Sequence, residues 1–89
     1  MKVSMDTTFF SPDLYLSAAL VIILQRLPQF KTVNRKVLFG FPINDELYKA
    51  MAQYNSGHPL NALEYAQAIK RLKSEMIMRR QNSIGVSHE

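Results

Sequence analysis

Residues 36–41, Lys-Val-Leu-Phe-Gly-Phe, constrain the fold of this 89-residue chain more than any other stretch. Val37, Phe39 and Phe41 recur at every second position, which places their side chains on one face of an extended strand. Pro42 then ends the strand, because proline has no N–H to continue a hydrogen-bonded ladder. A lone strand is not stable, so the flanking residues must supply both a pairing strand and a helical cover.

The segment Gln29–Val33 is the natural pairing strand. With a two-residue turn at Asn34 and Arg35, it forms a hairpin that collects the apolar side chains on one face. Asparagine suits a type I′ turn, whereas arginine in place of glycine at the second position leaves a longer loop as the alternative. The opposite pairs expected from the two-residue turn are Val33 with Lys36, Thr32 with Val37, and Phe30 with Phe39.

The sequence before the hairpin predicts an apolar helix. It begins at Ser11-Pro12-Asp13, where serine can cap, proline fits the first helical position and a carboxylate favours the positive end of the helix dipole. It runs to about Arg26 and is apolar nearly all round, which predicts a central helix covered on several sides. A membrane span needs about 20 apolar residues, and a signal peptide needs a small-residue cleavage site, so we set both alternatives aside.

Asparagine residues mark the starts of two further helices. Asn44 is placed to cap a helix that ends near Gly57, and Asn61 to cap one with Glu64 in a capping-box position. The last helix carries a buried stripe at helical spacing, made of Tyr65, Ile69, Leu72 and Met76. We expect one domain over residues 1–89, with an ordered core from about residue 9 to 80 and loose ends at 1–8 and 81–89.

The predicted fold is therefore α+β in the order α-β-β-α-α, with a two-stranded antiparallel hairpin packed against three helices. Five segments resemble a family of small uncharacterised bacterial domains of unknown function, which share an Asp-Leu helix start, an aromatic-rich strand and a Tyr-x-x-Gly helix end. These segments are residues 10–14 (Phe-Ser-Pro-Asp-Leu), 18–20 (Ala-Ala-Leu), 37–41 (Val-Leu-Phe-Gly-Phe), 54–57 (Tyr-Asn-Ser-Gly) and 72–73 (Leu-Lys). The resemblance implies a fold and supplies no reaction, ligand or catalytic residue.

The composition narrows the classes of function. Hydrophobic residues make up 47% and charged residues 20%, which is typical of a globular protein, and the lack of cysteine excludes disulfides and thiolate metal sites. His58 lies in a turn and His88 next to the last residue, without a metal-ligand spacing or a nucleophile motif around either. We therefore predict a non-enzymatic, cytoplasmic protein with no catalytic residue, cofactor or metal, and with no membrane partner.

The formal net charge of +4 is concentrated in the last helix. Four cations there would contact the phosphates of a nucleic acid: Lys70, Lys73, Arg79 and Arg80. A solvated helix face, with cations favoured by the C-terminal dipole, explains the same pattern. Aromatic side chains on which bases stack are absent from this end of the sequence. Nucleic-acid binding is therefore the alternative rather than the first hypothesis.

The first hypothesis is a protein-interaction module that forms a homodimer through its hairpin. The outer edge of the second strand has no guard against pairing before Pro42, and glycine within it would let another backbone approach closely. Pairing of residues 36–41 with their copy would make a four-stranded sheet. The dimer contacts would involve Lys36, Leu38 and Gly40.

Three tyrosines form a further candidate surface. At helical spacing, Tyr48, Tyr54 and Tyr65 are expected at the edge of the core with their hydroxyls reaching water. The alternative is that they together line a pocket or an interface, where tyrosine is enriched. Shared exposure of the three rings would distinguish the two interpretations.

Overall fold

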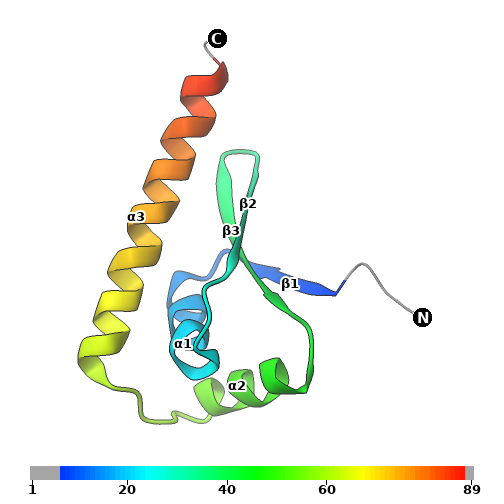
Figure 1. The fold of residues 1–89 in the computed structure, drawn as a ribbon, viewed down its shortest axis with the longest axis vertical. Helices are drawn as coiled ribbons and strands as arrows, with labels where there is room; N and C mark the ends of the chain where they lie inside the picture. The colour runs from blue at the N-terminus through cyan, green and yellow to red at the C-terminus, as the bar shows by residue number, and fades with distance from the viewer. Residues whose placement is uncertain (1–6, 88–89) are drawn as a thin grey trace.

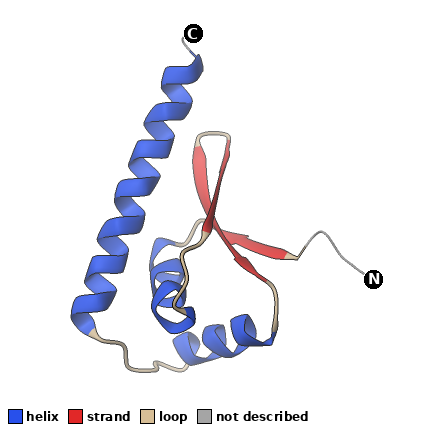
Figure 2. Cartoon of the chain, viewed as in Figure 1, coloured by secondary structure: helices blue, strands red, loops and turns tan. Residues whose placement is uncertain are grey.

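A three-stranded antiparallel sheet and three helices make up the computed structural model, which describes residues 7–87 (Figure 1). Along the chain the elements are β1 (Thr8–Ser11), α1 (Leu14–Leu24), β2 (Gln29–Val33), β3 (Lys36–Pro42), α2 (Asp45–Asn55) and α3 (Ala62–Ser87). Figure 2 shows α3 along one side of the sheet, α2 across its base and α1 between them. The predicted α+β class is confirmed, whereas the sheet has one strand more than predicted and the order is β-α-β-β-α-α.

The β2–β3 hairpin has the predicted register. Its two-residue turn forms at Asn34 and Arg35, whose φ angles of 51° and 66° both lie in the left-handed region that a type I′ turn requires. The hydrophobic pattern of the strands thus outweighs the unfavourable arginine, and the longer loop does not form. The opposite pairs are Val33 with Lys36, Thr32 with Val37, and Phe30 with Phe39.

The extra strand, β1, comes from a segment to which the sequence assigned no strand. It pairs antiparallel with β3 on the side opposite β2, with Phe9 across from Phe41 and Ser11 across from Phe39. β3 is therefore the central strand of the sheet. The prediction that its outer edge is open is wrong for residues 39–42, because these pair with β1.

Gly40 lies where β1 pairs with β3. Its partner is Phe10, and a Cβ atom at Gly40 would collide with the Phe10 ring and the methyl group of Thr8. The ring thus fills the space that a side chain at position 40 would occupy. A close approach at this glycine was expected, and the neighbour is a strand of the same chain rather than a second copy.

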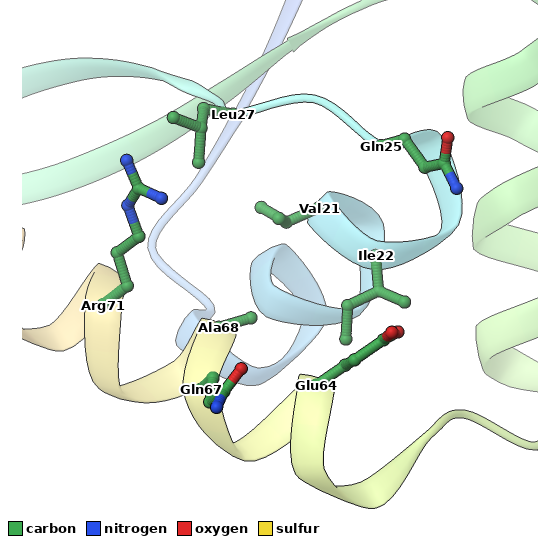
Figure 3. A pocket seen from close by; sticks show the side chains of 8 residues that line it. All are labelled: Val21, Ile22, Gln25, Leu27, Glu64, Gln67, Ala68 and Arg71. Atoms are coloured by element: carbon green, nitrogen blue, oxygen red, sulfur yellow. The ribbon is translucent and has the colours of Figure 1, made fainter.

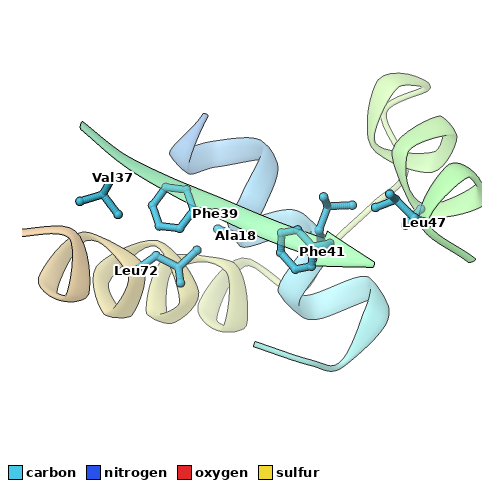
Figure 4. Close-up of a cluster of buried hydrophobic side chains, with 8 residues drawn as sticks. Ala18, Val37, Phe39, Phe41, Leu47 and Leu72 are labelled. Atoms are coloured by element: carbon cyan, nitrogen blue, oxygen red, sulfur yellow. The ribbon is translucent and has the colours of Figure 1, made fainter. Parts of the chain in front are cut away.

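The core lies between β3 and the helices. Val37, Phe39 and Phe41 point from β3 toward the helices (Figure 4), and each is at most 2% exposed. Leu72 of α3 is fully buried in the same cluster. The Phe39 ring also meets the Phe30 ring edge to face, with 5.9 Å between centroids. The alternation in residues 36–41 is thereby confirmed as the inner face of the sheet.

The apolar helix α1 packs against both α2 and α3, and its residues 17–20 are buried, as expected of a central helix. Its cap is Asp13 rather than Ser11, because the Asp13 carboxylate accepts the backbone N–H of Leu16 at 3.0 Å. Ser11 belongs to β1, and its hydroxyl accepts the N–H of Asp13 instead. Among the described residues, no helix is long and apolar enough to cross a membrane.

The caps of α2 and α3 are those that the sequence predicts. The Asn44 and Asn61 side chains accept backbone N–H groups three residues on, at 2.8 Å and 2.9 Å. Gly57 follows α2 with a φ of 80°, which only glycine adopts freely. The helix α3 continues to Ser87 and so extends through residues 81–87, which the sequence assigned to a loose end. Residues 1–6 and 88–89 of the predicted loose ends lie outside the described residues.

Replacing the most central ring tests the assignment of the core. We expect Phe39→Ala to lower the free energy of unfolding by about 3–5 kcal/mol, because it leaves a cavity between the sheet and the helices. Urea unfolding followed by circular dichroism measures this value. Val33→Ala is the control, since Val33 is 41% exposed on the same sheet. Similar unfolding midpoints for the two variants would contradict the assignment.

The close approach of β1 is tested at Gly40. We expect Gly40→Ala to lower the free energy of unfolding by about 1–3 kcal/mol, because the new methyl group collides with the Phe10 ring. In a Phe10→Ala background the same substitution should cost less, and a double-mutant cycle measures the difference. Equal losses in both backgrounds would show that the Phe10 ring does not lie over Gly40.

Candidate functional site

The four cations predicted to contact phosphates all lie exposed on α3, but Arg79 differs from the others. Its Nε donates to Oε1 of Glu75 at 3.2 Å, which makes an ion pair one helical turn apart. Its guanidinium also lies over the Phe30 ring, with 4.1 Å from Cζ to the ring centroid. Arg79 therefore joins α3 to β2, a role that the sequence did not indicate. The other three cations are Lys70, Lys73 and Arg80.

The contact between Arg79 and Phe30 brings a second basic segment beside α3. The hairpin turn and the C-terminal half of α3 point toward the same end of the molecule in Figure 1. We call the hairpin and the part of α3 from Lys70 to Gln81 the basic half, because these residues include eight cations and a single carboxylate, Glu75. The eight cations are Lys31, Arg35, Lys36, Lys70, Arg71, Lys73, Arg79 and Arg80, and all are exposed.

Carboxylates gather at the starts of helices instead. Asp13 caps α1, Asp45 and Glu46 lie in the first turn of α2, and Glu64 lies in the first turn of α3. Each is stabilised there by the positive end of the helix dipole. No aspartate or glutamate occurs between residues 14 and 44 of the sequence, which include β2 and β3. These four carboxylates therefore lie at helix starts, outside the basic half, which keeps a strong positive charge.

One face of the sheet turns away from the described helices. Residues on this open face alternate with the buried ones, so Phe10 and Leu38 lie on it and are partly exposed. The ammonium of Lys31 lies over the Phe10 ring, 4.9 Å from its centroid. The sequence predicted no aromatic side chain at the basic end, because β1 was not recognised and its Phe10 was not placed there. The open face includes Phe10, Gln29, Lys31, Val33, Lys36 and Leu38.

Of the three residues predicted to make dimer contacts, Gly40 lies in the part of β3 that β1 covers, whereas Lys36 and Leu38 do not. Gly40 is buried and hydrogen-bonded within the sheet opposite Phe10 of β1, so a second copy cannot pair with β3 there. Lys36 and Leu38 precede the part of β3 that β1 covers, and both lie on the open face. Because β1 occupies the edge of β3 at residues 39–42, a copy of the chain could not pair along the whole of residues 36–41 as predicted.

The three candidate tyrosines separate into two places. Tyr54 and Tyr65 line a pocket of about 360 Å³ beside the turn between α2 and α3, together with His58. Tyr48 does not line this pocket, and its side chain is 60% exposed on α2. The Tyr65 hydroxyl donates to the backbone carbonyl of Tyr15 at 3.0 Å and so connects α3 to α1. Of the three tyrosines, Tyr54 and Tyr65 therefore share a pocket, whereas Tyr48 lies apart from it.

The tyrosine contact predicts a dependence of stability on pH. Burial, and then the neighbouring Tyr54, raise the pKa of Tyr65 above its ordinary value. Because folding favours the neutral phenol, this contribution is present below about pH 10 and is lost as the pH rises through the folded-state pKa. We expect the Tm to fall above about pH 10, and to fall less steeply in Tyr65→Phe.

The exposed Tyr48 provides the control, and Tyr48→Phe should keep the parent's dependence of Tm on pH. Differential scanning calorimetry over a series of alkaline buffers measures all three proteins. Parallel curves for the parent and Tyr65→Phe would contradict the assignment of the effect to Tyr65.

A groove between the end of α1 and α3 is a further hollow, with a volume of about 360 Å³. Figure 3 shows Val21, Ile22 and Ala68 lining it, with Glu64 and Arg71 reaching from α3. The eight side chains that line the groove include no histidine and no hydroxyl nucleophile. The groove is thus an apolar floor with a mixed polar rim.

Neither a search for metal-ligand clusters nor comparisons with known proteins indicate a further site. Within the described part of the chain, no three histidine, cysteine, aspartate or glutamate residues come together to hold a metal ion. Comparisons with family models, curated proteins and solved structures found no match to the chain.

Proposed function

We propose that this chain is a small, non-enzymatic nucleic-acid-binding protein whose basic half contacts the phosphate backbone. The separation of charge carries this proposal. Eight exposed cations lie on the hairpin and the adjoining part of α3, and a single carboxylate, Glu75, lies among them. Each cation that contacts a phosphate releases condensed counterions, which supplies binding free energy for any nucleic-acid sequence.

The cations divide into structural and binding groups. Arg79 is held by Glu75 and Phe30, so its first role is to fix the hairpin against α3. Lys73 and Arg80 are exposed on the same helix and lie seven residues apart, which is nearly two helical turns and places them on one side of α3. This spacing of about 10 Å lets both reach one phosphate backbone. We assign the first phosphate contacts to this pair.

Salt dependence tests these contacts. We expect the plot of log K against log salt concentration to become shallower by about one unit for Arg80→Gln, and by about two for Lys73→Gln with Arg80→Gln. Unrelated duplex sequences should be weakened about equally, because phosphate contacts carry no sequence information. Fluorescence anisotropy with a labelled duplex at several salt concentrations measures the slopes.

Lys49→Gln is the matched control, since it removes one positive charge from the exposed face of α2. Its salt slope should equal that of the parent. Absence of binding by the parent at low salt would overturn the proposal, and so would a loss of slope in Lys49→Gln as large as that in Arg80→Gln.

A protein-interaction module is the second candidate function. The pocket beside Tyr54 and Tyr65 supports it, because Tyr15 and Leu63 nearby on α1 and α3 are 58% and 67% exposed. Exposed tyrosines are enriched at protein interfaces. Self-association of this module would use such a surface rather than the edge of β3. Light scattering after size exclusion tests it, and a mass that stays at 10.2 kDa at high concentration would exclude a homodimer.

A further inference from the structure

The open face of the sheet combines an aromatic ring with cations and carries no acid. Phe10 is partly exposed there, the Lys31 ammonium lies over its ring, and Lys36 lies on the same face four residues along β3 from Gly40, the partner of Phe10. None of the three strands contains an aspartate or a glutamate. Leu38 lies between Gly40 and Lys36 on this face, Val33 pairs with Lys36 next to the turn, and the described helices pack on the opposite face.

Neighbouring residues fix the position of the Phe10 ring. Gly40 leaves the space into which the ring settles, since any side chain there would collide with it. Pairing between β1 and β3 fixes the backbone of Phe10 at the same point. A ring held in this way loses little conformational freedom when a ligand stacks on it.

The Lys31 ammonium marks the face of the ring that a ligand would take. It lies 4.9 Å from the ring centroid, on an exposed and flexible stem. A flat aromatic group that replaces the ammonium on the ring leaves Lys31 free to pair with an anion close by. A nucleotide supplies both parts, because its base stacks and its phosphate is anionic.

We propose that the open face binds single-stranded nucleic acid, with one base stacked on Phe10, a neighbouring phosphate paired with Lys31, and a phosphate farther along the strand, toward the hairpin turn, paired with Lys36. The proposal rests on the proposed function and names the form of nucleic acid that it selects. A single strand exposes the faces of its bases, whereas a duplex keeps them stacked inside the helix. The open face therefore favours the single strand, while the cations of α3 serve both forms.

A tryptophan reporter tests the stacking directly, since the chain contains no tryptophan of its own. In Phe10→Trp, we expect titration with an oligo-dT of about 12 nucleotides to quench the indole fluorescence, because a base stacks on the ring. Tyr48→Trp is the control, with a reporter on the exposed face of α2, and should show no quenching at the same occupancy.

Binding measurements with Phe10→Leu then distinguish the contribution of aromatic stacking from that of side-chain volume. This variant keeps an apolar side chain over Gly40 and removes the stacking face. We expect its affinity for the oligo-dT to fall about five- to hundredfold, while its affinity for a duplex of equal length stays within about twofold. The thermal midpoint of each variant is compared with the parent, and Phe10→Trp serves as the aromatic replacement if Phe10→Leu does not fold.

The outcomes distinguish this proposal from the more general one. Equal affinity of parent and Phe10→Leu for the oligo-dT, or no quenching in Phe10→Trp, would overturn the stacking site while leaving the duplex contacts of α3 in place. Binding of polyglutamate as tightly as the oligo-dT would also overturn it, because an acidic polypeptide has no bases to stack. Absence of binding to both oligonucleotides by the parent would remove the proposed function together with this site.

Discussion

The pairing of β3 on both of its edges is the constraint on which the rest of the structure depends. Through β2 it brings Phe30 to Arg79 and so sets the hairpin against α3. Pairing with β1 places Ser11 in the sheet beside the core, so that Asp13 rather than Ser11 caps α1. The inner face of this one strand meets the helices, and its outer face receives the Phe10 ring. Both layers of the molecule are therefore organised from the same strand.

Strong local patterns made most of the fold predictable from the sequence. Alternating apolar residues gave the hairpin register, because a shift by one residue would turn every core side chain to solvent. The starts of α2 and α3 were predictable because Asn44 and Asn61 cap them through short-range hydrogen bonds. β1 was missed because four residues are too few for an alternation, and because its pairing partner lies about thirty residues away along the chain. The continuation of α3 past Gln81 likewise had no apolar stripe to reveal it.

The candidate site was predictable only in its charges. The cations of α3 were evident from the sequence, yet their division into structural and free groups depends on the contact of Arg79 with Phe30, 49 residues earlier in the chain. The aromatic member of the open face follows from β1, so missing the strand meant missing Phe10. Long-range pairing thus decides the chemistry of the surface as well as the arrangement of the core. Function here is harder to derive than fold because it depends on more non-local contacts.

The hairpin turn has a further consequence for the dynamics of the molecule. Arg35 holds a left-handed backbone conformation that glycine would adopt freely, which stores roughly 1–2 kcal/mol in the turn. The strands beside it end in exposed residues, Val33 and Lys36, so little packing opposes that strain. Local opening therefore begins at this tip, and its amide hydrogens exchange with solvent sooner than those near Phe39. The end of the hairpin that carries a guanidinium is also the end that is freest to adapt its shape.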